Sequence, residues 1–326
     1  MSRQEDGRKP AKQRLPWFQF TIRTALVVMT VFAIWLGLKT DRARRQGEAV
    51  QAVEDREGHV AYEHEMVGDP FATVPSGGKK GSSEPKPPGP ARLRELLGRE
   101  YFDTVVRVDL SRRSITDEDL ALLKDLPQLQ ELNLTETSIS DAGIEHLKDL
   151  VNLRRLVMAD TAITSEALAH LRGLKDLETL YIMRTNVADD GLVHLRDLAK
   201  LRYLTLDGTA VSDAGLAHLS GLDLYSLGIA DTQVKGPGLK HLVGQKNLTV
   251  LAIEGNEIGE EHLAHLAHLG NLRHLFIGLP EVSDPAILHL QRLKSLRSLR
   301  VRDPAPGGDD LAKLRKALTG VTVYSP

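Results

Sequence analysis

Among the residue types that could bind a metal, histidine has the most regular spacing in this sequence. Seven of the twelve histidines precede a leucine at a recurring slot: His146, His170, His194, His218, His241, His265 and His289. We expect this column on the outer helices of a stack, with neighbours roughly 8 to 10 Å apart, whereas zinc holds its ligands at about 2 Å. His262, His265 and His268 follow at intervals of three, which turns them away from one helix face. The sequence therefore predicts packing histidines rather than a metal site, and a shared charge change below about pH 6 stays open.

A second group of metal-binding residue types, His59, Glu63, His64 and Glu65, lies in a segment of alternating polarity. Its spacing matches no recognised metal site, and we interpret it as the solvated face of a short strand. The chain has no cysteine, which excludes thiolate metal sites and a cysteine nucleophile. Neither a nucleophile–base pair nor a phosphate-binding loop stands out. We expect no catalytic residue, no metal and no cofactor.

The aromatic residues favour a binding function. Between Val105 and Val323 there are four, all on or beside the outward face of a predicted strand: Tyr181, Tyr203, Tyr225 and Phe276. Together with Arg155, Met183 and Arg184 they predict a partner-binding patch, because Tyr, Met and Arg are enriched in protein interfaces. The alternative is that these rings pack across neighbouring strands.

A repeat must position these side chains. One leucine recurs every 24 residues, with one step of 23 after Leu204: Leu132, Leu156, Leu180, Leu204, Leu227, Leu251, Leu275 and Leu299. This period is typical of a solenoid, in which each unit packs against its neighbours. Leu132 and Leu134 alternate inward as a short strand, so Glu131 and Asn133 point outward. The sequence predicts strands on one face of the stack and short helices on the other.

Polar residues recur where each strand ends. A hydroxyl or amide occupies one slot in six copies: Thr137, Thr161, Thr185, Thr209, Thr232 and Asn256. We expect stacked copies to hydrogen-bond each other's backbone there. Ser140 and Asp141 then offer oxygens that cap the short helix. The departures from the pattern are Arg113, Pro280 and Pro304 in the Thr slot, and Ser165 and Gly236 in the Asp slot. They predict irregular end repeats and an irregular sixth copy.

The repeat, of the form LxxLxLxxTxITDxGLxHLxxL, resembles that of membrane-anchored leucine-rich-repeat proteins of bacteria, over about two thirds of the chain. The resemblance implies an α/β fold: a right-handed leucine-rich-repeat solenoid, or horseshoe, of about eight repeats with end caps, preceded by one N-terminal transmembrane helix. It implies a concave strand face that binds a partner, and it implies no catalytic residues.

We expect five segments: a basic tail over 1–14, a transmembrane signal anchor over 15–38, a juxtamembrane helix and short strand over 39–74, a Pro/Gly-rich linker over 75–90, and the repeat domain over 91–326. The anchor spans roughly 36 Å as a helix, against a hydrocarbon core of about 30 Å. A cleaved signal peptide is the alternative, but no small-x-small cleavage site directly follows Leu38.

The membrane orientation is set only weakly by charge. Lys and Arg number five before the span and five just after it. The short tail and the single early span favour a single-pass protein of the inner (cytoplasmic) membrane, with the repeats on the periplasmic or outer side.

Both ends of the stack need covers. Residues 91–106 are predicted as the N-terminal cap, in which Leu93, Leu96 and Leu97 form the apolar face of a helix that ends at Gly98. At the other end, we expect a helix over Asp310–Thr319 followed by a last strand. A basic edge near this end is made by Arg297, Arg300 and Arg302, and we interpret it as solvated rather than as an anion site.

The sequence predicts a non-catalytic, membrane-tethered module that binds a protein or peptide on its concave face. The alternative is a structural envelope or scaffold component without a specific ligand. The net charge of −2 gives no electrostatic case for nucleic acid.

Overall fold

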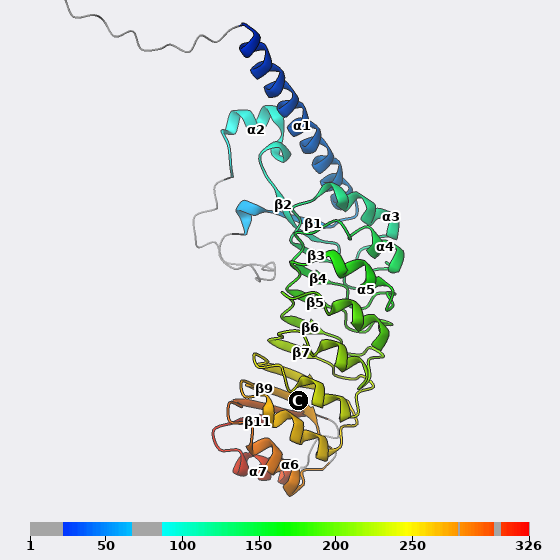
Figure 1. Cartoon of the computed structure of the whole chain (residues 1–326), viewed down its shortest axis with the longest axis vertical. Coiled ribbons are helices and arrows are strands. Elements are labelled where there is room, and N and C mark those ends of the chain that lie inside the picture. Colours follow the sequence, from blue (N-terminus) through cyan, green and yellow to red (C-terminus); the bar gives the residue numbers. More distant parts are fainter. Residues whose placement is uncertain (1–21, 67–86, 280, 303–307, 326) are drawn as a thin grey trace, which may run out of the picture.

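The structure is a computed structural model that describes residues 22–66, 87–279, 281–302 and 308–325. The predicted basic tail, the first part of the anchor, most of the linker, Pro280 and Pro304 lie outside the described residues. Figure 1 shows a long N-terminal helix followed by a curved stack of repeats. Helix α1 runs without interruption over Ile22–Asp55. Among the described helices, the part of α1 from Thr24 onward is the one that is long and apolar enough to cross a membrane. A signal sequence would also meet this description.

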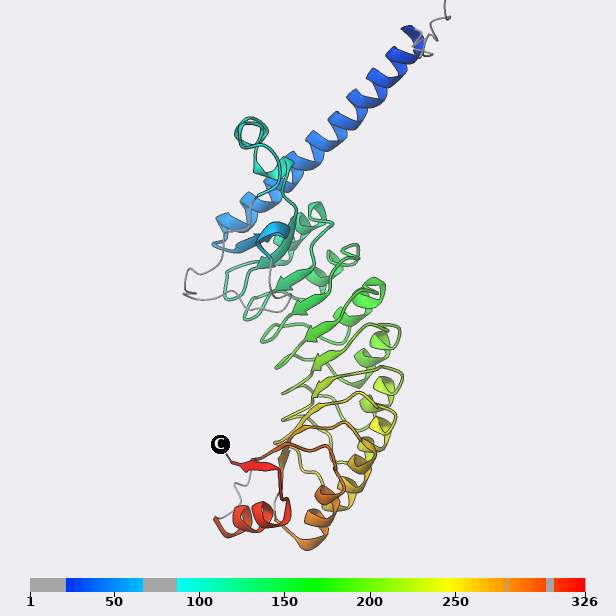
Figure 2. The ribbon, with the colours of Figure 1, turned by 90° about the vertical axis from the view of Figure 1, so that its left-hand side faces the viewer.

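The described strands form one sheet in which spatial order follows sequence order. They are β1 (His59–Tyr62), β2 (Val105–Asp109), β3 (Glu131–Asn133), β4 (Arg155–Val157), β5 (Thr179–Tyr181), β6 (Tyr203–Thr205), β7 (Ser226–Gly228), β8 (Val250–Ile253), β9 (His274–Gly278), β10 (Ser298–Arg302) and β11 (Thr322–Tyr324). Strand β1 is antiparallel to β2, and each later strand is parallel to the one before it. Figure 2 shows the strands on the inner side of the curve and the helices on the outer side.

The outer side consists of short helical segments. The α-helices are α3 (Asp117–Leu120), α4 (Asp141–Glu145), α5 (Ala167–His170) and α6 (Asp284–Gln291), and the 3-10 helices are η3 (Ala121–Asp125), η4 (Leu171–Gly173), η5 (Asp189–Leu195), η6 (Gly215–Leu219), η7 (Pro237–Leu242) and η8 (Glu260–His268). Buried leucines there are three residues apart, as in Leu263 and Leu266. A 3-10 helix has three residues per turn, so this spacing places every such leucine on the core side.

Leucine layers form a continuous core along the stack. The recurring strand leucines are at most 1% exposed, from Leu132 to Leu299. Burial of a large aliphatic side chain contributes roughly 1.5–3 kcal/mol, which offsets the entropy lost on ordering. The copy that lacks one residue is completed by its neighbour, because the buried Gln245 amide donates to Leu219 O and accepts from Leu224 N.

The polar slots differ from the prediction. The threonine hydroxyls donate within their own repeat, as Thr137 Oγ1 does to Leu134 O at 2.6 Å. The expected bridge between copies occurs at Asn256, which bonds Ile229 and Thr232 of the preceding repeat. The threonine prediction was therefore wrong for the hydroxyls, because the strand exit brings each hydroxyl nearest to the carbonyl three residues earlier.

Aspartates of the next slot join neighbouring repeats. Asp141 accepts from the Thr164 amide at 2.7 Å and from its hydroxyl at 2.6 Å. The same clamp joins Asp117 to Ser140 and Asp189 to Ser212. In the Asp slot Ser165 Oγ accepts from Ala188 N at 3.1 Å and donates to Asp190 Oδ1, whereas Gly236 offers no side chain. The expected irregularity is therefore seen as a clamp with a different bond pattern at Ser165 and a missing clamp at Gly236.

The cover of the first repeat differs from the expected one. It consists of the second half of α1 and of β1, whose Val50, Val53 and Tyr62 are buried in the core cluster. The expected cap helix forms as α2 (Ala91–Leu97), but its Leu93 and Leu97 are 43% and 46% exposed. Residues 39–62 thus extend the repeat stack rather than merely linking it to the anchor.

The last repeat is covered as predicted. Helix α7 spans Gly308–Ala317, and β11 adds a parallel strand to β10. Leu314, Leu318 and Val323 are at most 5% exposed. This cap needs no distant segment, because its helix and strand directly follow the repeat that they cover.

Candidate functional site

The concave face is built from outward side chains in strict register. One column passes through Tyr203, Ser226, Val250 and His274, and the next passes through Tyr181, Thr205, Gly228, Ala252 and Phe276. Tyr225 lies one residue before β7, at the edge of the sheet. The three predicted tyrosines therefore run diagonally across three neighbouring repeats.

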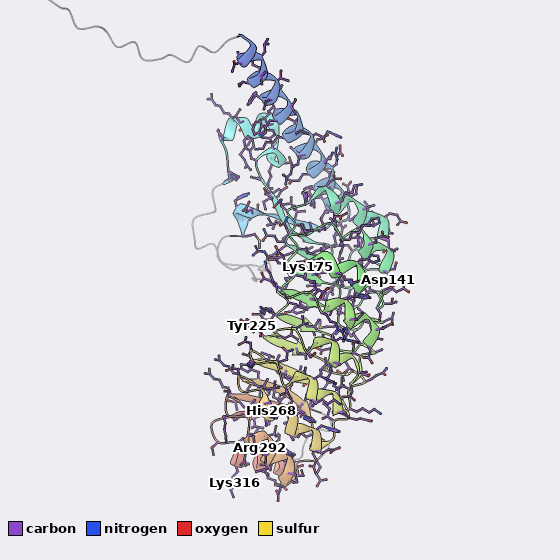
Figure 3. The ribbon with its side chains drawn as sticks, in the orientation of Figure 1. Asp141, Lys175, Tyr225, His268, Arg292 and Lys316 are labelled. Atoms are coloured by element: carbon purple, nitrogen blue, oxygen red, sulfur yellow. The ribbon has the colours of Figure 1, made fainter. Side chains whose placement is uncertain are left out.

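Tyr203 and Tyr225 line an open groove at this edge. Their ring centroids are 6.2 Å apart and the rings meet edge to face at 84°. Tyr225 is 40% exposed, and Figure 3 places it on the side of the molecule opposite to Asp141. The groove measures about 360 Å³ and is lined by Tyr203, Tyr225, Ser226, Asn247, Thr249, Val250, Asn271 and Arg273. We call it the tyrosine groove.

Polar groups complete the tyrosine groove. Thr249 Oγ1 donates to Tyr225 O at 2.9 Å, and Asn271 Nδ2 donates to Lys246 O at 2.8 Å, so both side chains are fixed. Arg273 is exposed, and within the described part of the chain its guanidinium has no hydrogen bond or ion pair. Aromatic rings, amide oxygens and a guanidinium together suit an extended peptide, whose backbone and side chains need all three.

The other predicted binding residues are engaged within the molecule. The Arg155 guanidinium lies 5.0 Å from the Tyr181 ring centroid, a cation–π contact. Arg184 forms an ion pair with Asp160 and has a φ of 52° in the turn that follows β5. Met183 is half-buried in the same turn. Arg155 and Tyr181 thus lie on strands β4 and β5, and Met183 and Arg184 lie in the turn that follows β5. A ligand would have to displace the partners of Arg155 and Arg184.

Phe276 lies apart from the tyrosines. The Arg300 guanidinium lies 4.7 Å from its ring centroid and also pairs with Glu254, to which Arg300 Nε donates at 3.0 Å. Arg302 lies 3.7 Å from both Glu254 and Asp231. The predicted basic edge is thus largely neutralised by acidic side chains two and three repeats earlier.

Asp207 is an acidic residue near the concave face whose pKa is shifted upward. Burial, together with nearby Asp231 and Glu254, raises its pKa above the ordinary value of 3.8, against the lowering effect of the Ala230 N–H. That amide donates to Asp207 Oδ1 at 2.8 Å. The carboxylate form of Asp207 is therefore destabilised in the folded protein.

The histidine column lies on the convex side. Its members are exposed or half-buried beside core leucines, and His218 contacts Arg196. The prediction that His262 and His265 face apart was wrong, because η8 is a 3-10 helix and their rings stack at 6.2 Å. Over the ranges that the structure describes, no three His, Asp or Glu side chains gather as metal ligands.

Sequence reasoning missed three residues near the tyrosines. Arg202 lies 5.7 Å from the Tyr225 ring centroid, and Asn271 and Arg273 line the groove. A signal was present, since Arg202, Tyr225 and Arg273 share the slot directly after the first leucine of their repeats. That slot was not counted as outward-facing because it precedes the strand proper.

The fold defines the class: a leucine-rich-repeat solenoid preceded by one apolar helix. No protein-family model matches the sequence, and a search of curated proteins found no match. Among solved structures, internalin C2 of Listeria monocytogenes is 21% identical with a TM-score of 0.44, over 68% of this chain and 81% of the internalin.

Two further solved structures show a similar likeness. A leucine-rich-repeat protein of Leptospira interrogans is 18% identical with a TM-score of 0.49, over 66% of this chain and 59% of its own. The plant peptide hormone receptor RGFR1, solved in complex with RGF2, is 15% identical with a TM-score of 0.42, over 68% of this chain and 36% of its own. At this identity the likeness concerns the fold alone.

Proposed function

We propose that this chain is a non-catalytic, membrane-tethered leucine-rich-repeat protein that binds a protein or peptide in the tyrosine groove of its concave face. The observation that carries the proposal is that one groove is lined by the exposed Tyr225 ring and by the Arg273 guanidinium, which has no partner within the described residues. Aromatic and Arg side chains are the usual energetic centres of protein interfaces. The apolar surface of α1 supplies the tether, in an inner membrane with the repeats outside the cytoplasm.

Photo-crosslinking tests the location of binding. A photoreactive phenylalanine analogue replaces Tyr225 in the full chain, and the matched control replaces Val193 on the convex side, since the two side chains are 40% and 38% exposed. We expect adducts to a distinct protein from position 225 alone, and fewer of them when Arg273→Ala is added. Equal adducts from both positions would contradict concave-face binding. Adducts only to a second copy of this chain would favour a structural, self-associating role.

A further inference from the structure

A pocket lies where α1 meets the segment before β2. It measures about 460 Å³ and is lined on one side by Trp35, Lys39 and Arg42 of α1, and on the other by Tyr101 and Phe102. Figures 1 and 2 both show α2 and this segment beside α1. The proposed peptide binding does not use this pocket, which is at the opposite end of the stack from β9–β11.

Two basic and two acidic side chains line the pocket, and they differ in whether they already have a partner. Lys39 Nζ lies 5.5 Å from the Trp35 ring centroid and 5.3 Å from that of Tyr101, and it has no acidic partner within the described ranges. Arg42 is exposed and has no hydrogen bond or ion pair there either. Of the two carboxylates at the pocket, that of Asp103 is paired with Arg94, whereas that of Glu100 has no hydrogen bond or ion pair within the described residues.

The pocket wall is held in place by a buried amide. Gln46 is 6% exposed, and its Nε2 donates to Asp103 O at 2.8 Å and to Glu100 O at 3.4 Å. Arg94 donates to both carboxylate oxygens of Asp103, at 2.7 and 2.8 Å. The segment that carries Tyr101 and Phe102 is therefore fixed against α1, and the pocket does not depend on a loose loop.

The pocket begins where the apolar part of α1 ends. Lys39 is the first charged residue after the apolar run over 24–38, whose side chains are exposed. Trp35 lies one turn before it, and aromatic rings are enriched where a span leaves the hydrocarbon. Exposed Leu93 and Leu97 on α2 add apolar surface nearby. If α1 spans a bilayer, the pocket opens at the level of the lipid headgroups.

We propose that this pocket binds the phosphate headgroup of an anionic phospholipid, with Lys39 and Arg42 contacting the phosphate oxygens and the ring of Trp35 beside the upper acyl chain. Both cations are suited to phosphate, Arg through paired N–H donors and Lys as a mobile point charge. This inference rests on the membrane tether of the proposed function. The same groups would also accept inorganic phosphate.

Quenching of Trp35 fluorescence tests the proposal. The full chain carries Trp17→Phe, which leaves Trp35 as its one tryptophan. It is placed in vesicles of equal parts phosphatidylcholine and phosphatidylglycerol, with brominated acyl chains on one lipid or the other. We expect stronger quenching by brominated phosphatidylglycerol. Lys39→Gln/Arg42→Gln is expected to reduce this preference on the order of tenfold, because both charge-assisted contacts to the phosphate are lost.

The matched control is Arg44→Gln/Arg45→Gln. It removes the same charge from the same helix, but these guanidinium groups pair with Asp41 and Glu48. All four mutated side chains are exposed, so both variants should keep the wild-type melting temperature. An equal loss of preference in both variants would indicate diffuse attraction and would overturn the pocket.

Two other outcomes separate the proposals. Equal quenching by both lipids would retain the tether and overturn the pocket, whereas quenching by neither lipid would contradict the tether itself. Inorganic phosphate at constant ionic strength is expected to leave the lipid preference unchanged. Loss of the preference on adding phosphate would assign the pocket to the free ion and overturn lipid binding.

Discussion

At the scale of single residues, the concave aromatics differ in how closely a guanidinium group approaches the ring. Tyr181 and Phe276 lie beneath the guanidinium groups of Arg155 and Arg300. The 40% exposure of Tyr225 leaves part of its ring accessible, although Arg202 lies near it. A ligand can bury the accessible part of such a ring directly, whereas a ring closely covered by a cation first requires displacement of that cation. The tyrosine groove is therefore the strongest part of the predicted patch.

The clamp between repeats leads to a first prediction. Asp141→Ala removes two hydrogen bonds to Thr164 and leaves both donors without their acceptor. We expect a loss of about 1–3 kcal/mol in the free energy of unfolding, measured by urea denaturation. Asp149→Ala is the control, because Asp149 is exposed and makes no hydrogen bond within the described residues; its effect should stay within about 0.5 kcal/mol. Equal effects would show that the clamp adds no stability.

Asp207 leads to a prediction about pH. Because its pKa is raised in the folded state, ionisation costs stability as the pH rises from the ordinary value of 3.8 through the raised value. Asp207→Asn keeps the acceptor for Ala230 N and removes the charge. The variant should therefore melt at a higher temperature than wild type at neutral pH. The gain should disappear below about pH 3.8, where wild-type Asp207 is also neutral. A constant difference across this range would show that charge is not the cause.

At the scale of elements, the leucine spacing predicted the strands and the outer helical side but not the type of helix. Intervals of three suit a 3-10 helix, and this is why His262 and His265 stack instead of diverging. The predicted cap at 91–106 failed for a different reason. Val50 and Val53 cover a layer that includes Val105 and Val108, more than 50 residues later, and single-sequence periodicity does not show which distant segments meet.

The position of the cap leads to a prediction for truncated chains. A chain that begins at Lys39 retains Val50, Val53 and Tyr62, whereas a chain that begins at Ala91 lacks all three. Each contributes roughly 1.5–3 kcal/mol by burial, so the shorter chain should unfold at a clearly lower temperature and expose apolar surface. Differential scanning calorimetry and binding of a hydrophobic dye measure both effects. Equal melting temperatures of the two chains would indicate that residues 91–106 cap the first repeat.

At the scale of the whole molecule, each repeat contacts its neighbours in sequence and little else, because strand order follows chain order. The repeat architecture could be predicted from the sequence for this reason, since one period determines every layer. The tyrosine groove could be predicted only in part. Its tyrosines stand out by type, but the other wall comes from residues whose orientation depends on how successive repeats align.

This arrangement predicts where damage spreads. Leu204→Ala and Leu299→Ala each remove a fully buried leucine from the same position of the repeat. Leu204 lies in the middle of the stack and Leu299 lies near its end. Each should cost about 2–5 kcal/mol locally. Hydrogen exchange should quicken on both sides of the central substitution, but only towards the C-terminal cap for the terminal one. Uniform acceleration along the chain in both variants would indicate that the stack unfolds as one unit.

Because α1 is unbroken, it fixes how the repeats are rotated about the helix axis relative to the proposed tether. The same helix contains both the apolar run and the buried Val50 and Val53. The direction in which the concave face points is therefore fixed by the helical phase. One residue inserted after Lys39 would rotate that direction by about 100° about the helix axis and move the repeats about 1.5 Å further along it. A second inserted residue would turn the concave face to nearly the opposite direction. Two chains that differ only in the number of inserted residues would present the concave face to different neighbouring proteins in the same membrane.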